Sequence, residues 1–250
     1  MSATLLELAS TPHLMVVTDF DGTLAGISKD AYNVPINQRS IAALEAMADL
    51  PLTTVAILTG RHLEGLRQAS GLVPGKLIIA GSHGAESSDQ PIALTDAQVT
   101  ALAAITKEFD RLADGIPGVF VEHKPYHRVL HGVRATDLEA RDKAMEEALK
   151  LNIDGVTIKP GKFMVEASVT DVTKGVWIQR AIESHQPTAT VFIGDDTTDE
   201  DGFKVLGDSD LAVKVGEGDT AADIRVADTD AVGDFLTELA RLRSENFAAK

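Results

Sequence analysis

The sequence predicts an α/β fold, in which a doubly wound, Rossmann-like parallel sheet carries an inserted α+β domain. Short apolar, β-branched runs bounded by Gly or Asp recur toward both ends of the chain, and helix-like patterns separate them. This alternation is typical of buried parallel strands joined by helices. In the middle of the chain, strand-like runs instead follow one another across short turns, which indicates antiparallel pairing.

The core elements follow one another in chain order. Each strand run is short and almost wholly apolar, as expected for a strand buried on both faces of a sheet. An alanine-rich segment from Asp230 predicts a closing helix that frays toward Lys250. Ligands of such sheets bind where the strands end. The sequence predicts strands at 14–18, 53–58, 76–80, 190–193 and 211–215, and helices at 37–48 and 173–184.

The middle of the chain predicts a separate α+β domain. We expect residues 1–88 and 170–250 to form the core and residues 89–169 to form the insertion, because polar residues and short turns replace the strand pattern at both joints. Turns at Pro125-Tyr126 and Pro160-Gly161 would connect antiparallel strands. The expected elements are helices at 96–113 and 137–149 and strands at 119–124, 129–133, 155–159 and 162–166.

Composition and charge limit the classes of function. Of the 250 residues, 44% are hydrophobic and 24% are charged, which is ordinary for a globular protein with a substantial core. The formal net charge of -15 argues against nucleic acid or an anionic membrane as a partner. It would also repel a phosphorylated substrate at long range. A site for such a substrate therefore needs a metal ion and a few Lys or Arg side chains.

The chain contains no cysteine, which excludes disulfides, thiolate catalysis and cysteine-ligated metal sites. No apolar stretch approaches the roughly twenty residues that span a bilayer. The N-terminal residues include Glu7 and no basic leader, so they lack the character of a secretion signal. We therefore expect a cytoplasmic protein, and we expect it to be a monomer.

The first strand delivers two carboxylates into a glycine turn, in the sequence Asp19-Phe20-Asp21-Gly22. Because side chains alternate along a strand, Asp19 and Asp21 would point the same way. Two adjacent anions persist where a divalent cation neutralises them or where one stays protonated. Both conditions suit hydrolysis of a phosphate ester, with Asp19 as nucleophile and Asp21 as proton shuttle. Taken alone, the motif is equally compatible with a plain Asp-Gly turn.

Two further segments supply groups for a phosphoryl oxygen. Thr59, Gly60 and Arg61 follow the second strand, where a hydroxyl and a backbone N–H can hold phosphate. A threonine in this position can also be a helix N-cap. Lys174 begins the helix at 173–184 and would offset the charge of a nucleophilic carboxylate and of a phosphate. The alternative for this residue is a solvated lysine at a helix start.

Five acids in the seven positions 195–201 follow the strand at 190–193. Such a density needs cations, hydrogen bonds or solvent. Mg²⁺ is the best fit, because it prefers oxygen ligands and bridges to phosphate oxygens. Asp195 is the expected direct ligand, whereas Asp196 and Asp199 would orient metal-bound water or the lysine. The alternative is an acidic loop that favours the positive end of a helix.

These motifs occur in a specific order: Asp-x-Asp, Thr-Gly, a basic residue and an Asp-Asp cluster, each at or near a strand end. The order resembles that of the haloacid dehalogenase-like phosphatases. The likeness runs from Asp19 to Asp201, and the insertion lies where that superfamily has a cap domain. The resemblance implies a Mg²⁺-dependent phosphatase that forms an aspartyl-phosphate, with catalytic Asp19, Asp21, Thr59 and Lys174 and with specificity supplied by the cap. It also implies that Asp195, Asp19 and the carbonyl of Asp21 hold the Mg²⁺.

Finer features resemble the trehalose-6-phosphate phosphatases. They are the segments Gly81-Ser82-His83-Gly84-Ala85-Glu86, Val121-Glu122-His123-Lys124 and Gly194-Asp195-Asp196-Thr197-Thr198-Asp199-Glu200. This likeness implies trehalose 6-phosphate as substrate, and a cap whose polar side chains hydrogen-bond the sugar hydroxyls. The residues that it implies for substrate binding are Gly60, Arg61, His83, Glu122, Lys124, His131, Arg134, Lys162 and Glu166.

Other functions stay open on the sequence. A phosphatase of the same superfamily that acts on sucrose phosphate, mannosyl phosphoglycerate or a hexose phosphate would carry the same core motifs. A receiver domain also combines an acidic pair with a phosphorylatable Asp, a Thr and a Lys, but it has no use for Asp21 as a shuttle and leaves the insertion unexplained. A silent sensor would bind a sugar phosphate without hydrolysing it. Without the resemblance, the charged residues of the insertion are an ordinary solvated sheet face.

Overall fold

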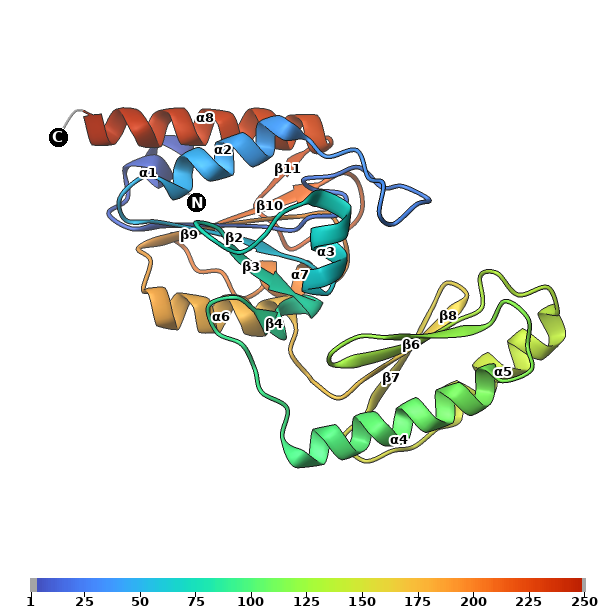
Figure 1. Ribbon diagram of the computed structural model, residues 1–250. Coiled ribbons are helices and arrows are strands. Elements are labelled where there is room, and N and C mark those ends of the chain that lie inside the picture. The colour runs from blue at the N-terminus through green and yellow to red at the C-terminus, as the bar shows by residue number, and fades with distance from the viewer. Residues whose placement is uncertain (1–3, 249–250) are drawn as a thin grey trace. The chain divides into compact units, whose positions relative to one another are not determined.

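The computed structural model describes residues 4–248, and the chain divides into two compact units (Figure 1). The first unit comprises Met1–Pro91 and Val172–Lys250, and the second comprises Ile92–Asp171. The boundaries expected from the sequence, after residue 88 and before residue 170, lie a few residues from these limits. In the part of the chain that the structure describes, no helix is both long enough and apolar enough to cross a membrane.

A seven-stranded sheet forms the centre of the first unit, in the order β11-β10-β9-β1-β2-β3-β4. Its strands are parallel except for β4, which runs antiparallel to β3. β1 (Leu14–Thr18) lies between β2 and β9, so the carboxyl ends of these three strands are neighbours. The other strands are β2 (Thr53–Leu58), β3 (Ile78–Gly81), β4 (Glu86–Ser87), β9 (Ala189–Gly194), β10 (Leu211–Val215) and β11 (Ile224–Val226).

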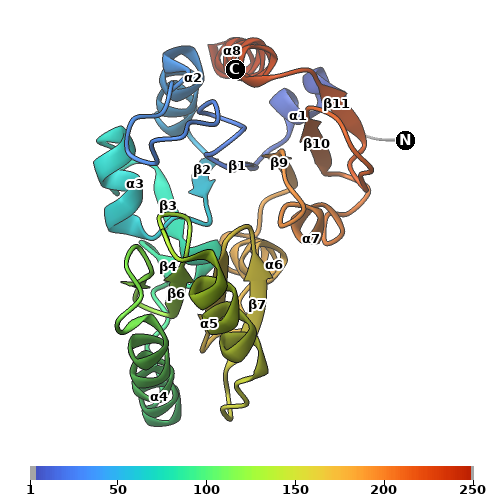
Figure 2. The same ribbon diagram turned by 90° about the vertical axis from the view of Figure 1, so that its right-hand side faces the viewer.

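Helices cover both faces of this sheet (Figure 1, Figure 2). Alternate residues of β1 therefore enter two different cores: Val16 packs with α1, α2 and α8, whereas Val17 packs with α6 and α7. All five residues of β1 are buried, as expected for a strand covered on both sides. One face carries α1 (Leu5–Ser10), α2 (Gln38–Ala48), α3 (Leu63–Ser70) and α8 (Thr229–Ala248), and the other carries α6 (Lys174–His185) and α7 (Glu200–Phe203). The fraying expected toward Lys250 falls outside the described residues.

The second unit is a four-stranded antiparallel sheet, in the order β5-β6-β8-β7, with two helices on one face (Figure 1). Leu130 and Val165 point to that face and pack with Ile105 and Phe109 of the first helix. Residues one position along each strand point to the opposite face. The elements are α4 (Asp96–Ala113), β5 (Phe120–His123), β6 (His127–His131), α5 (Leu138–Lys150), β7 (Thr157–Gly161) and β8 (Met164–Ser168).

The structure confirms the parallel core with an antiparallel insertion, and it corrects several local predictions. The strands expected at 155–159 and 162–166 lie two residues later, at Thr157–Gly161 and Met164–Ser168. The expected turn at Pro160-Gly161 is wrong: both residues end β7, paired with β8, and the turn follows at Lys162 and Phe163, where Phe163 has φ 57°. Proline is tolerated there because β7 is an edge strand and needs fewer backbone donors. Val133 lies beyond the end of β6 and is 62% exposed, although the sequence predicted a strand through it.

Candidate active site

The predicted core residues follow neighbouring strands of the first unit. Asp19 comes directly after β1, Thr59 after β2 and Asp195 after β9. The parallel pairing continues past the strand ends, because the N–H of Asp19 donates to the carbonyl of Ile193 at 2.8 Å. Parallel strands bring their carboxyl ends to one edge of a sheet, and this edge is the usual place for a ligand. The fold therefore gathers residues that are far apart in the sequence.

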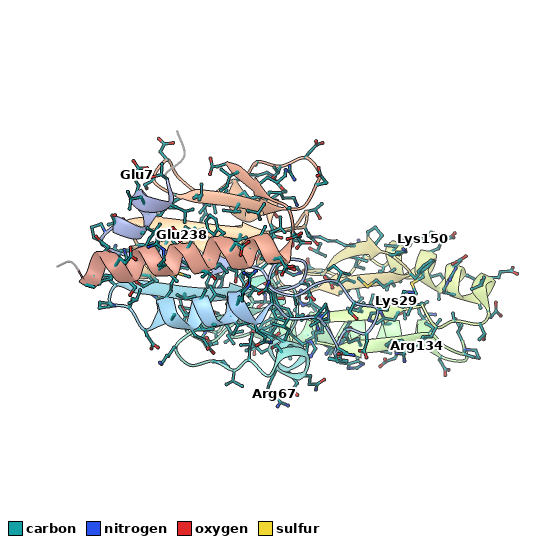
Figure 3. All side chains as sticks on the ribbon, turned by 90° about the horizontal axis from the view of Figure 1, so that it is seen from above. Glu7, Lys29, Arg67, Arg134, Lys150 and Glu238 are labelled. Atoms are coloured by element: carbon teal, nitrogen blue, oxygen red, sulfur yellow. The ribbon has the colours of Figure 1, made fainter. Side chains whose placement is uncertain are left out.

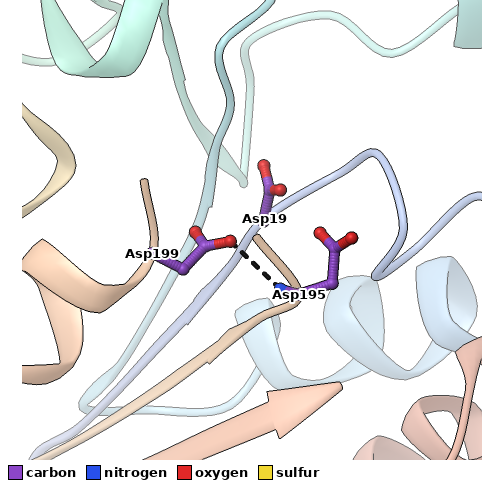
Figure 4. A group of neighbouring side chains, drawn as sticks. All are labelled: Asp19, Asp195 and Asp199. Carbon is purple, nitrogen blue, oxygen red and sulfur yellow. Dashed lines mark hydrogen bonds between the residues drawn. The ribbon is translucent and has the colours of Figure 1, made fainter. Parts of the chain in front are cut away.

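Three carboxylates meet at this edge, and we refer to Asp19, Asp195 and Asp199 as the acidic trio (Figure 4). One oxygen from each lies within 4.8 Å of the others. Asp19 is 5% exposed and Asp199 is fully buried. The carboxylates of Asp19 and Asp195 point to the same side, while Asp199 turns toward the backbone of its own loop. Three anions this close require compensating positive charge.

Lys174 supplies part of that charge. Its Nζ lies 3.0 Å from Asp19 Oδ1 and 2.7 Å from Asp199 Oδ1, and the side chain is 2% exposed. The hydroxyl of Thr173 accepts a hydrogen bond from the N–H of Val176 and so starts α6 at Lys174. The alternative of a solvated lysine at a helix start is therefore wrong.

One ammonium is shared between two buried carboxylates, which leaves a net negative charge. Burial raises the pKa of Asp19 well above its ordinary value; Lys174 opposes this effect and the charge of Asp199 adds to it. Burial acts to lower the pKa of Lys174, but the two carboxylates outweigh it and the pKa rises. A further cation would relieve this excess of negative charge.

The acidic trio fits a hard divalent cation. Asp195 Oδ1 is buried and accepts no hydrogen bond within the described part of the chain. Burial, with the charges of Asp199 and Asp196, raises the pKa of Asp195 to about 6. Both oxygens of Asp199 are already engaged, one by Lys174 and the other by the N–H groups of Asp195 and Asp196 at 3.0 Å each. This donor set suits an ion held by Asp19 and Asp195, with Asp199 fixing the lysine and the loop.

Gly22 makes room for the carboxylate of Asp195. Its φ is +77°, and a Cβ at this position would lie 2.0 Å from Asp195 Oδ2. The residue is therefore required twice, once for its backbone conformation and once for its missing side chain. The glycine of the Asp-x-Asp-Gly sequence thus shapes the cation site.

Asp21 does not join the acidic trio, and it forms a bidentate ion pair with Arg61. Arg61 Nε and Nη2 lie 2.6 Å and 2.7 Å from the two oxygens of Asp21. The guanidinium also donates to the carbonyl of Ala31 and lies over the ring of Phe20, with Cζ 5.6 Å from the ring centre. The pair engages both oxygens of Asp21, so its opening would free this carboxylate for another partner.

Thr59 and His83 lie on either side of Gly60. Thr59 is buried, and its hydroxyl accepts from the N–H of Arg61 at 3.1 Å. Its alternative role as a helix N-cap is wrong, because α3 begins at Leu63 after His62. His83 has φ 56°, and its ring atom Cε1 lies 2.8 Å from where a Cβ of Gly60 would be. A left-handed histidine is unusual, and here it holds the imidazole against the Thr59–Gly60 segment.

Asp196 stays within its own loop. Its Oδ1 accepts from the N–H of Thr198 and from the hydroxyl of Thr197. These hydrogen bonds lower the pKa of Asp196 even though burial opposes them. The structure thus places it as a brace for the acidic loop.

Predicted sugar-binding residues gather on one face of the second unit. Val129 of β6 is paired with Glu122 of β5 and with Glu166 of β8, so these three residues form one row. This face is opposite the one that packs on α4 and α5. Glu122 Oε2 lies 2.9 Å from His131 Nε2 and 3.9 Å from Lys124 Nζ. The sheet thus presents a cluster of acidic and basic groups on its helix-free side.

Two other predicted residues lie outside the strands of this sheet. Lys162 is exposed in the turn between β7 and β8. Arg134 is exposed after β6 (Figure 3). Its Cζ lies 5.6 Å from the centre of the Phe120 ring, which stacks on His131. Arg134 and His131 therefore contact the same aromatic ring, that of Phe120.

A family model built from known protein sequences matches the sequence of this chain. The model described as trehalose-phosphatase aligns with residues 17–230, which include every core residue named above. The chain belongs to the trehalose-phosphatase family. The trehalose-phosphate phosphatase of Mycobacterium marinum is 32% identical over 92% of this chain and 62% of its own length. That of Mycobacterium avium is 33% identical over 78% of this chain and 51% of its own length. The chain thus spans less than two thirds of these relatives.

Solved structures share the fold with this member of the trehalose-phosphatase family. The C-terminal domain of the trehalose-6-phosphate phosphatase of Candida albicans has a TM-score of 0.72 at 21% identity, covering 95% of both chains. A trehalose-6-phosphate phosphatase from Aspergillus fumigatus has a TM-score of 0.68 at 23% identity, covering 96% of this chain and 98% of its own. A haloacid dehalogenase-like hydrolase from Bacteroides thetaiotaomicron has a TM-score of 0.64.

Sequence reasoning missed one charged residue of this trehalose-phosphatase family site. Lys214 lies in β10, is 4% exposed, and donates from Nζ to the backbone carbonyl of Asp195. The signal was present, since β10 reads Leu-Ala-Val-Lys-Val and a lysine inside a buried strand needs a partner. Only the strand order, with β10 beside β9, reveals that the partner is the acidic loop.

Proposed function

We propose that the chain hydrolyses trehalose 6-phosphate to trehalose and inorganic phosphate, with Asp19 as the nucleophile. The carrying observation is the contact of Asp19 with Lys174 beside Asp195, at the carboxyl edge of a sheet in a trehalose-phosphatase family member. A buried carboxylate beside a lysine and a cation site suits attack on phosphorus better than a structural ion pair does.

In the first step, a carboxylate oxygen of Asp19 attacks phosphorus and the sugar alkoxide leaves, which gives an aspartyl-phosphate. Lys174 stays on the other oxygen of Asp19 and favours its ionised form, which opposes the burial that raises the pKa of Asp19. The hydroxyl of Thr59 and the N–H of Gly60 hold a phosphoryl oxygen. In the second step, water attacks the same phosphorus and Asp19 is regenerated.

Asp21 protonates the leaving alkoxide and then takes a proton from the attacking water. It can do so only after the ion pair with Arg61 opens. We propose that the incoming phosphate competes for Arg61, because a guanidinium binds phosphate in the same bidentate way as it binds a carboxylate. Binding of substrate would thus release the acid at the moment when it is needed.

Mg²⁺, when bound by Asp19, Asp195 and the carbonyl of Asp21, would supply positive charge to a phosphoryl oxygen and to the nucleophile. The chain's own contribution is to hold the two carboxylates on one side, with Asp199 fixed to Lys174 and to the loop.

We propose that residues 89–169 are a cap that recognises the sugar. A disaccharide offers many hydroxyls. The face bearing Glu122, His131 and Glu166 offers groups that accept hydrogen bonds from hydroxyls and groups that donate to them. Lys124, Lys162 and Arg134 would add donors at its margins. A cytoplasmic location and a monomeric state remain predictions from the sequence.

The test is release of phosphate from a panel of sugar phosphates, with and without Mg²⁺. Trehalose 6-phosphate should be favoured by at least about tenfold in kcat/KM over sucrose, mannosyl-glycerate and hexose phosphates, because unpaired polar groups penalise the wrong sugar. Asp19→Asn should bind substrate but release no phosphate. A preference for another sugar phosphate would mean that the chain is a different sugar phosphatase of the same superfamily. Binding without turnover would indicate a sensor.

A further inference from the structure

Lys214 is a buried cation that the proposed reaction does not use. The other residues of β10, Leu211 to Val215, are apolar and buried, and Lys214 among them is 4% exposed. Within the described residues, no carboxylate oxygen lies within 4.0 Å of its Nζ. Its hydrogen bond goes instead to the backbone carbonyl of Asp195. A buried ammonium bound to a neutral carbonyl is costly, so it calls for a reason.

The position of Lys214 follows from the strand register. It is paired with Gly194, the last residue of β9, so its side chain reaches the next residue of that strand. A lysine at this point of β10 is therefore aimed at the start of the acidic loop.

The main chain around Asp195 is held from three directions. Its own N–H and the N–H of Asp196 donate to Asp199 Oδ2 at 3.0 Å each. Its carbonyl accepts from Lys214. The peptide groups on both sides of the Asp195 Cα are therefore fixed. With Gly22 leaving space for the carboxylate, the remaining freedom of the residue is its own side-chain torsions.

We propose that Lys214 is a positioning residue that aims the Asp195 carboxylate at the cation shared with Asp19, and thereby sets the affinity for a divalent ion. The inference rests on the proposed function only through its cation site. Loss of the bond would leave the Asp195–Asp196 peptide held only through the N–H of Asp196. The Asp195 carboxylate would then be free to take other orientations, and the ion would have to order it on binding, at a cost in affinity.

The test is calorimetric titration of Mg²⁺ alone into wild-type chain and Lys214→Met. Methionine keeps the length of the side chain without a charge or a donor. The dissociation constant should rise at least about tenfold, in the range seen when a group that orients a ligand is removed. At saturating Mg²⁺, kcat should stay within about threefold and KM for the sugar phosphate should not change. If Lys214→Met fails to fold, Lys214→Gln takes its place.

Arg243→Met is the matched control. Arg243 is likewise fully buried and binds backbone carbonyls, but those of Ala9, Pro12 and Leu52, at the opposite ends of the strands. This variant should lose stability and keep its Mg²⁺ affinity. Equal losses of affinity in both variants would show that any buried cation matters, and would overturn the proposal.

The absence of cysteine allows a direct rescue. Lys214→Cys, aminoethylated while unfolded and then refolded, restores an ammonium at nearly the native distance, and wild type refolded in the same way is the reference. Mg²⁺ affinity should return to within about threefold of that reference. Unchanged affinity in Lys214→Met, or no rescue, contradicts the positioning role. Wild-type chain that binds Mg²⁺ but hydrolyses no sugar phosphate would refute the proposed function alone.

Discussion

Substitution of Gly22 by alanine tests how the first loop shapes the cation site. Two costs can be separated. The first is conformational, because φ at this position is +77° and an L-residue in the left-handed region loses about 1–2 kcal/mol. The second is steric, because the new Cβ would lie 2.0 Å from Asp195 Oδ2.

The steric cost falls on Asp195. Carbon–oxygen contacts normally open to about 3.3 Å, so the carboxylate must move by more than 1 Å. A short side chain can rotate away, which limits the loss of stability, but it then no longer faces Asp19. A displacement of about 1 Å at a reacting centre costs about 10²-fold in rate. We therefore expect Gly22→Ala to raise the Mg²⁺ dissociation constant at least tenfold and to lower kcat about 10²-fold.

Gly71→Ala is the matched control, because Gly71 has φ +73° and a Cβ there would meet nothing within 4 Å. The assay compares urea unfolding, Mg²⁺ titration and phosphate release for both variants. Both should lose about 1–2 kcal/mol of stability, and only Gly22→Ala should lose Mg²⁺ affinity. If Gly22→Ala binds Mg²⁺ within twofold of Gly71→Ala, or if both variants lose affinity together, Gly22 does not shape the cation site.

Three other predictions follow from the site. Lys174→Met leaves two buried carboxylates without their cation, so unfolding should show a loss of about 3–5 kcal/mol, partly restored by Mg²⁺; an unchanged stability would mean that the carboxylates are already neutral. The pKa of Asp195, raised by burial from 3.8 to about 6, means that the folded chain binds more protons than the unfolded chain between these values. Relative to Asp195→Asn, metal-free wild type should therefore lose stability as pH rises from about 4 to about 6, and saturating Mg²⁺ should abolish the loss in wild type; a relative gain over that window would contradict the assignment. Glu122→Gln weakens the pair with His131, so kcat/KM for trehalose 6-phosphate should fall about tenfold while p-nitrophenyl phosphate hydrolysis changes less than twofold; equal losses on both substrates would argue against a sugar contact.

The sequence predicted the core where local pattern and global fold agree. The apolar runs of β1 and β2 are long enough and uniform enough that strand, burial and the position of Asp19 follow together. Prediction from the sequence failed where the pairing of strands decides the local structure. The end of β7 contains Pro160, which a local analysis assigns to a turn, but edge pairing with β8 keeps it in the strand.

For the same reason, the contacts within the site could not be predicted without the tertiary structure. Arg61 and Asp21 lie on different strand ends, and nothing local indicates that they form a bidentate pair. Lys214 reaches Asp195 only because β10 lies beside β9. Residue types at strand ends are visible in a sequence, whereas their partners depend on strand order.

Rapid acid quench of wild-type chain mixed with ³²P-labelled trehalose 6-phosphate and Mg²⁺ shows whether Asp19 attacks phosphorus. The label should appear transiently on the peptide that contains Asp19, be lost in base as expected for an acyl phosphate, and be absent in Asp19→Asn. Phosphate release without any labelled protein, or with the label on another residue, would contradict the account.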